Sequence, residues 1–247
     1  MWIASGFKYT EWNRASMSNQ GSFSGRNPIE LVTRLNQLWR EGGLHAIRQG
    51  AEDYLRHNTI ILDRKYEDVR SDTDYRWEFI NNHINDSTER LLDIGCAEGY
   101  FCARAAGKGI NAVGIDTNEK RIKQAKADHP NVDFRVQTLS PDNVTELPES
   151  DIILCLTVHH GFVNGYGWDE SVEMMKTILE KGDLLVYEGS GIRRDHPSLD
   201  EDLETIDYYR ELLFDIYEDA EIIEETYTEY GSGERTDSMY IVDCSNI

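Results

Sequence analysis

The hydrophobic positions between residues 90 and 188 follow two alternating patterns. Short runs rich in apolar and β-branched residues are typical of buried strands, and the segments between them carry apolar residues at helical spacing. The predicted strands are 90–96, 111–116, 132–137, 151–158 and 183–188, and the predicted helices lie near 100–108, 119–128 and 168–180. This regular alternation favours a parallel sheet with helices on both faces.

The pattern changes after residue 200. A helix predicted around 200–217 is followed by two strand-like runs, 220–229 and 238–243, which are joined through Gly231-Ser232-Gly233. Adjacent strands joined by a glycine turn form a hairpin, which closes the sheet with an antiparallel edge. The predicted fold is therefore α/β: a Rossmann-like, doubly wound, mostly parallel seven-stranded sheet with an antiparallel C-terminal edge hairpin.

The chain before this sheet has a different character. Residues 1–26 show no helical or strand period, so we expect an irregular segment there. Asn27-Pro28 begins a predicted helix that Gly42-Gly43 ends, and a second helix is predicted for 44–57. We expect three parts: the irregular segment 1–26, an N-terminal helical appendage 27–74 and an α/β domain 75–247. The appendage could pack on the domain, or contact a substrate or a membrane surface.

Charge is unevenly distributed along the chain. The sequence has 46 acidic and 25 basic residues, a net charge of −21, but residues 1–60 carry seven Lys and Arg against five Asp and Glu. Such a surface disfavours unspecific contact with phosphate backbones, so we expect no nucleic-acid partner. The acidity could equally be a halophile's adaptation to high salt, in which case it says little about partners.

Cysteine usage and hydropathy bear on the compartment. The four cysteines, at positions 96, 102, 155 and 244, show no spacing typical of metal ligands, so we expect a reduced, cytoplasmic protein without a metal site. The longest strongly apolar stretch, 152–158, is too short to span a bilayer. Contact with the inner membrane surface remains open through residues 1–60. The sequence predicts no oligomeric state.

Residues 91–101 form an apolar strand that leads into a glycine-punctuated turn and then a helix. Gly95 permits a tight turn and close backbone approach, and Gly99 lets the helix pack against the strand. About twenty residues further on, a second buried strand ends in Asp116, whose carboxylate suits the two hydroxyls of a ribose. A ligand would lie across the carboxyl ends of the strands.

Through Asp93, Gly95, Gly99 and Asp116 this segment resembles the class I S-adenosylmethionine-dependent methyltransferases. The resemblance covers residues 90–188 as an order of elements, and it implies S-adenosylmethionine as the cofactor. Ala97 stands where many members have glycine, and the residues expected beside the adenine stand where an acid is more usual. The implied cofactor site consists of Asp93, Gly95, Cys96, Ala97, Gly99, Asp116, Thr117, Gln137 and Thr138.

His159 and His160 follow the fourth predicted strand, where the family brings the acceptor to the methyl group. Methyl transfer is an in-line displacement, so the protein must align the nucleophile, exclude water and, for a hydroxyl, remove a proton. One of the histidines could act as general base or orient the acceptor. Because neighbouring strand residues point opposite ways, we expect only one to reach the site. The absence of an Asp/Asn-Pro-Pro-Tyr motif favours an oxygen acceptor.

Three further residues are candidates for substrate binding. Arg193 and Arg194 follow the fifth predicted strand and could receive an anionic group through forked hydrogen bonds, or could be a solvated pair that balances nearby acids. Tyr166, on a predicted glycine-rich loop after His160, could stack on or hydrogen-bond a sugar or ring, or could belong to a lid hinge.

The predicted function is S-adenosylmethionine-dependent O-methylation of a small molecule or saccharide, for example a lipid-linked sugar or its carboxylate. In style, the acidic composition and helical opening resemble methyltransferases that modify cell-surface glycans of salt-loving archaea. Two alternatives remain open. Methylation of RNA or protein needs a basic surface, which only residues 1–60 offer. A noncatalytic protein could keep the cofactor site without transferring a methyl group.

Overall fold

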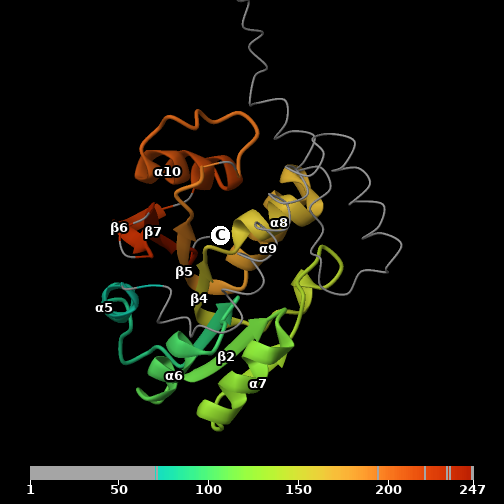
Figure 1. Ribbon diagram of the computed structural model, residues 1–247, viewed down its shortest axis with the longest axis vertical. Helices are drawn as coiled ribbons and strands as arrows, with labels where there is room; N and C mark the ends of the chain where they lie inside the picture. Colours follow the sequence, from blue (N-terminus) through green and yellow to red (C-terminus); the bar gives the residue numbers. More distant parts are fainter. Residues whose placement is uncertain are drawn as a thin grey trace, which may run out of the picture. The chain divides into compact units, whose positions relative to one another are not determined.

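Figure 1 shows the computed structural model of the chain, which describes residue 70 and residues 72–193, 195–219, 221–231, 233 and 235–245. These residues belong to one unit, 65–247. The predicted irregular segment 1–26 and almost all of the predicted appendage 27–74 lie outside the described residues. Their boundaries, and any membrane contact of residues 1–60, therefore stay predictions.

The strands form a seven-stranded sheet in the order β3-β2-β1-β4-β5-β7-β6. Neighbouring strands among β1 to β5 pair in parallel, and β7 pairs antiparallel with both β5 and β6. The strand bounds are β1 Arg90–Ile94, β2 Asn111–Asp116, β3 Asp133–Val136, β4 Ser150–Leu156, β5 Gly182–Gly189, β6 Glu221–Tyr230 and β7 Arg235–Asp243. The predicted mostly parallel sheet with an antiparallel C-terminal hairpin is confirmed.

The strand order reverses between β1 and β4, because the chain passes from β1 outward to β3 and then returns to β4. In open α/β sheets the loops on either side of such a switch point diverge and leave a crevice at the carboxyl ends of the strands. The ends of β1, β2, β4 and β5 are therefore where a ligand should bind.

The helices confirm the predicted alternation, with one correction. Their bounds are α5 Thr73–Asn81, α6 Tyr100–Ala106, α7 Glu119–Asp128, the 3-10 turn η2 Val144–Glu146, α8 His159–Tyr166, α9 Trp168–Leu179 and α10 Thr205–Ile216. The sequence predicted a strand to residue 158 and a glycine-rich segment after His160, but β4 ends at Leu156 and α8 follows. Thr157 breaks the strand with a φ of +54°. Gly161 and Gly165 are tolerated in the helix because they face open space.

Two apolar clusters cover the sheet. One contains residues of α9 and α10 packed with Ile153, Leu185 and Val242 of the strands. The other contains residues of α5, α6 and α7 packed with Leu154, Val186 and Ile241. Neighbouring strand residues point to opposite faces of a sheet, which explains how one strand serves both clusters. Helices therefore cover both faces (Figure 1), as the doubly wound prediction requires.

The four cysteines are all buried and free. Among the described residues, no helix is both long enough and apolar enough to cross a membrane.

Candidate active site

The turn after β1 owes its shape to two glycines. Gly95 has a φ of +79° and Gly99 a φ of +84°, a left-handed conformation that glycine adopts at low cost. A Cβ on Gly95 would lie 2.6 Å from Cγ2 of Val158, and one on Gly99 would overlap the ring of Phe134. The glycine loop, residues 95–99, is thus packed between the end of β4 and a side chain of β3, and a Cβ at Gly95 or Gly99 would displace one of these neighbours.

Ala97 occupies the middle of the glycine loop with a φ of +49°. A left-handed conformation costs a residue with a Cβ about 1–2 kcal/mol. Ala97 therefore adds a small backbone strain that glycine at this position would avoid.

Asp116 ties the glycine loop to the end of β2. Its Oδ2 accepts a hydrogen bond from the Ala97 backbone N–H at 3.0 Å, and its Oδ1 accepts one from the Asn118 N–H at 2.7 Å. A carboxylate has about four lone-pair sites, so acceptor capacity remains for a ribose diol. The partly exposed carboxylate at the end of β2, hydrogen-bonded to the glycine loop, fits the ribose of S-adenosylmethionine. Thr117, next to it, is exposed.

Asp93, in β1, and Cys96, within the glycine loop, are both buried. Asp93 is 2% exposed, and its burial raises the pKa of the carboxyl to about 7, while the Cys102 thiol at 3.6 Å and Arg76 act in the opposite direction. Cys96 is buried, and its Sγ would lie 2.8 Å from a Cβ at Gly114. Asp93 thus contacts α6 through Cys102, and Cys96 packs the glycine loop against β2 at Gly114.

The predicted adenine side lies at the end of β3. The Gln137 backbone N–H donates to the Asp116 carbonyl at 3.0 Å, and the Thr138 carbonyl accepts from Asn143 at 3.0 Å. Tyr166, at the end of α8, donates its hydroxyl to the Leu139 carbonyl at 2.9 Å. The structure thus brings Tyr166 to the loop after β3, beside the expected adenine position.

His159 and His160 are the first two residues of α8. Because a helix rotates by about 100° per residue, their side chains point in different directions and have different environments. His159 is 1% exposed, and its Nδ1 lies 3.0 Å from the Tyr187 hydroxyl. Its Nε2 is buried and has no hydrogen-bond partner among the described residues. Burial lowers the pKa of His159 to about 3, and the neighbouring His160 adds to this effect. His159 is therefore neutral at physiological pH.

His160 is exposed at the start of α8. Although it reaches solvent, the protein around it desolvates the imidazole and lowers its pKa, an effect that the Asp195 carboxyl opposes. Asp195 is 9% exposed, and burial raises its pKa. The Tyr209 hydroxyl lies 2.7 Å from Asp195 Oδ2 and 2.6 Å from the Ser190 carbonyl. The Asp195 carboxyl, which Tyr209 holds in place, thus acts electrostatically on the His160 imidazole.

Arg193 closes the loop after β5. Its Nη1 donates to the Leu203 carbonyl at 2.7 Å, at the far end of the same loop, and its Nε is buried without a hydrogen-bond partner among the described residues. Arg194 lies outside the described residues. The described contact of Arg193 is thus made within the protein, and its binding of a substrate stays a prediction.

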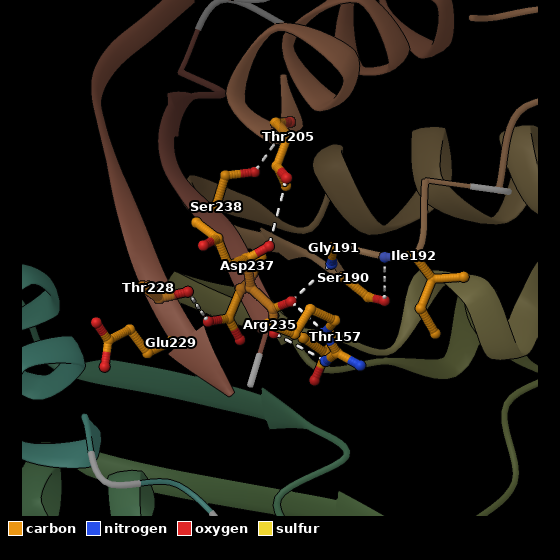
Figure 2. A network of polar contacts seen from close by, with 12 residues as sticks. Thr157, Ser190, Gly191, Ile192, Thr205, Thr228, Glu229, Arg235, Asp237 and Ser238 are labelled. Carbon is orange, nitrogen blue, oxygen red and sulfur yellow. Dashed lines mark hydrogen bonds and ion pairs between the residues drawn. The ribbon is translucent and has the colours of Figure 1, made fainter. Parts of the chain in front are cut away.

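A charged cluster at the start of β7 was not predicted; Figure 2 shows two of its members, Arg235 and Asp237. Asp237 is fully buried and accepts from Arg235, from Arg70 and from the Gly191 backbone N–H. Glu188, at the end of β5, pairs with Arg70 at 2.9 Å and with Arg76 at 2.6 Å. The alternation of Arg235 and Asp237 on one strand was a weak signal, because their partners are distant in the sequence.

Fold and site together define a protein that binds a nucleoside-bearing cofactor at the carboxyl ends of a doubly wound sheet. A family model described as a methyltransferase domain matches residues 85–207. The chain belongs to the class I S-adenosylmethionine-dependent methyltransferases, and S-adenosylmethionine is its cofactor. In the described part of the chain, no group of three or more His, Cys, Asp or Glu is arranged to hold a metal ion.

Two curated relatives differ in what their names say they modify. The O-antigen chain terminator bifunctional methyltransferase/kinase WbdD of Escherichia coli is 27% identical over 134 residues, covering 49% of this chain and 19% of that protein. The tRNA U34 carboxymethyltransferase of Colwellia psychrerythraea is 36% identical over 133 residues, covering 53% of this chain and 35% of that protein. The matched region is thus well under half of each relative.

Solved structures show the same fold. A crystal structure of WbdD has a TM-score of 0.55 and 22% identity, covering 69% of this chain and 40% of that chain. The N-methyltransferase NodS from Bradyrhizobium japonicum, in complex with S-adenosyl-L-homocysteine, has a TM-score of 0.53 and 14% identity, covering 74% of this chain and 93% of NodS.

Proposed function

We propose that the protein transfers a methyl group from S-adenosylmethionine to a hydroxyl oxygen of a small molecule or saccharide, with His160 as the general base. One observation carries the proposal: the exposed imidazole of His160 lies just past the carboxyl end of β4, where Val158 packs against Gly95 of the glycine loop and the Asp195 carboxyl acts electrostatically on the imidazole. The base candidate therefore stands two residues from a direct contact with the cofactor loop.

The residues divide the chemical work. When bound, S-adenosylmethionine supplies an electrophilic methyl group on a sulfonium. The His160 imidazole would accept the O–H proton of the acceptor as its oxygen takes up the methyl group. The negative form of Asp195 stabilises the imidazolium that results. Tyr209 keeps the Asp195 carboxyl in position.

His159 takes no part in this proton transfer. A base with a pKa of about 3 has little driving force to accept a proton near neutral pH, and its imidazole is buried against Tyr187. Its contacts with Tyr187 and Trp168 give it a structural role, since the ring centroids lie 5.9 and 6.0 Å apart. Of the two predicted catalytic residues, we therefore propose His160.

A saccharide acceptor is supported by composition and by one relative. The chain's net charge of −21 opposes binding to a polyanion such as RNA. WbdD, by its name, acts on an O-antigen chain. The tRNA U34 carboxymethyltransferases favour RNA as a second candidate acceptor, and the experiment below separates the two.

The test is incubation of the protein with methyl-labelled cofactor and fractionated cell extract. We expect label in a sugar or lipid-linked sugar fraction, in a linkage that resists mild alkali, because a methyl ether survives conditions that hydrolyse a methyl ester. His160→Asn should lower the rate about 10²- to 10⁴-fold, the usual contribution of a general base. His83→Asn is the matched control, because His83 lies between α5 and β1 and pairs with Glu224.

Two results would contradict the proposal in different ways. Label in RNA or protein would refute the acceptor class. An undiminished rate in His160→Asn, with the cofactor bound normally, would refute the assignment of the base.

A further inference from the structure

Arg235 begins β7 at the same end of the sheet as His160. β7 runs antiparallel to β5 with Ser238 opposite Gly189, so residues 235–237 extend beyond the carboxyl end of β5. Arg235 and Asp237, two positions apart on one strand, point to the same face. Figure 2 shows both beside the loop formed by Ser190 and Gly191.

Three contacts orient the Arg235 guanidinium. Its Nε and Nη2 donate to the two carboxylate oxygens of Asp237 at 2.6 and 2.9 Å. Its central carbon lies 4.2 Å from the ring centroid of Tyr230. Its side chain also packs on Gly191, where a Cβ would come within 2.6 Å of Arg235 Cγ. The guanidinium is therefore held in one orientation before a ligand binds, which lowers the entropy cost of binding.

The third nitrogen of the guanidinium, Nη1, makes no hydrogen bond or ion pair with any other described residue, and 26% of the side chain is exposed. Asp237 does not depend on Arg235 alone, because Arg70 Nη1 lies 3.2 Å from its Oδ2 and the Gly191 N–H lies 2.6 Å from its Oδ1. The charge of Asp237 is thus shared between two arginines. Arg235 keeps an unused donor edge and part of its positive charge for a ligand.

This donor edge lies within electrostatic reach of the proposed base. Desolvation lowers the pKa of His160, and the positive charge of Arg235 adds to this effect. Asp195 and Asp237 act on the same imidazole in the opposite direction. The end of β4, which precedes His160, the end of β5 and the start of β7 lie at the same edge of the sheet, so an acceptor beside His160 would lie at the edge that carries the oriented arginine.

We propose that Arg235 binds an anionic oxygen of the acceptor, a carboxylate or a phosphate ester, next to the hydroxyl that is methylated. The assignment rests on the proposed function, because it places the acceptor beside His160. Two N–H groups on one guanidinium edge form charge-assisted hydrogen bonds that suit an oxyanion. The acceptor is then an acidic saccharide, such as a uronic acid or a sugar phosphate.

The test measures binding and does not depend on turnover. The full chain is saturated with S-adenosylhomocysteine and titrated with glucuronate, glucose 6-phosphate and, as the neutral counterpart, glucose. We expect binding of one or both anionic sugars and none of glucose at the same concentrations. Arg235→Gln should weaken the anion's Kd about tenfold to a hundredfold, the range for a hydrogen bond to a charged group. Arg235→Lys should weaken it less.

Arg210→Gln is the matched control. Like Arg235, Arg210 uses Nε and Nη2 on one carboxylate, that of Glu225, and its side chain is 32% exposed, but it lies on α10 against the middle of β6. Its variant should leave the Kd of the anionic sugar unchanged. Unchanged affinity for S-adenosylhomocysteine in each variant shows that the fold is retained.

The possible failures are distinguishable. Equal binding of glucose and glucuronate, no binding of either anion by the unmodified chain, or normal anion binding by Arg235→Gln would each overturn the role of Arg235. Methyl transfer to a neutral sugar would overturn it while supporting the proposed function. Transfer to RNA or protein would refute the proposed function, whatever the sugars do.

Discussion

Protonation of His159 should couple the stability of the fold to pH. In the folded protein its pKa is about 3, and in the unfolded chain it returns to the ordinary value of 6.5. When the pKa of a histidine is lower in the folded state than in the unfolded state, the full stability is present at a pH above the unfolded-state pKa. This stability is lost as the pH falls below 6.5, because the unfolded chain then takes up the proton.

The size of the effect follows from these two values. At about pH 5 the unfolded chain gains about 2 kcal/mol from protonating this one residue, because that pH lies 1.5 units below 6.5. The folded state gains almost nothing, since about pH 5 is still well above its own pKa of about 3. The expected loss at this pH is therefore set by the unfolded chain.

Urea unfolding of the full chain and of His159→Phe measures the effect. Phenylalanine keeps a ring against Trp168 and Tyr187 but cannot titrate, and the hydrogen bond that it removes costs a similar amount at each pH. Between about pH 7.5 and pH 5, the unmodified chain should lose about 2 kcal/mol more unfolding free energy than the variant. Many carboxyl groups also titrate, but they do so in both proteins. Equal losses would show that His159 is protonated in the fold, and would reopen its candidacy as the base.

Three further substitutions test the site. Gly99→Ala should destabilise the fold by more than the roughly 1–2 kcal/mol of left-handed strain, because its Cβ would overlap the ring of Phe134. The control is Gly109→Ala, where φ is +88° and a Cβ meets open space, so it should cost about the strain alone. Equal losses of unfolding free energy in urea would refute the packing argument. Asp116→Asn should weaken the affinity for S-adenosylhomocysteine, measured by calorimetry, about tenfold or more, because an amide cannot accept from two backbone N–H groups and a ribose together. An unchanged Kd would show that Asp116 is not part of the cofactor site. Tyr209→Phe should lower kcat about tenfold without changing cofactor affinity, because Asp195 loses a hydrogen bond of about 1–1.5 kcal/mol. An unchanged kcat would show that Tyr209 does not position Asp195.

The sheet could be predicted from the sequence because its signals are local. Each strand between residues 90 and 188 is a short apolar run, and the glycine turn before residue 235 identifies the hairpin. The glycine loop and Asp116 were predictable for the same reason. A strand–turn–helix unit that holds a nucleoside needs the glycine turn and the acid at the end of the next strand, about twenty residues apart in the sequence.

Helix α8 was not predicted, because its intrinsic helix propensity is low and its formation depends on tertiary packing. Gly161 and Gly165 count against a helix in isolation, yet both face open space, and buried neighbours such as Phe162 supply the packing that holds the helix. The expectation that only one histidine reaches the acceptor rested on strand alternation. In the structure one histidine is buried and the other is exposed, but the reason is the rotation of about 100° per residue at the start of a helix.

The charged cluster on β7 lay beyond local reasoning altogether. Arg70 and Asp237 are 167 positions apart, and Gly191 and Asp237 are 46 apart. The neighbouring sequence does not distinguish Arg235 from Arg193. In the structure, Asp237 and Tyr230 hold Arg235 in one orientation, whereas Nη1 of Arg193 donates to a carbonyl of its own loop. Only the pairing of β5 with β7 brings Arg235 to the carboxyl end of the sheet.

The position of Arg235 also bears on how so acidic a chain could bind an anion. The net charge of −21 repels an anionic ligand at long range, but salt screens that repulsion over a Debye length of about 10 Å or less. A hydrogen bond from an oriented guanidinium acts at about 3 Å and is screened much less. Selectivity for an acidic saccharide can therefore come from one preorganised donor edge. A long polyanion such as RNA would also meet the repulsive surface around that edge, so the same charge pattern that permits a small anionic acceptor disfavours a nucleic acid.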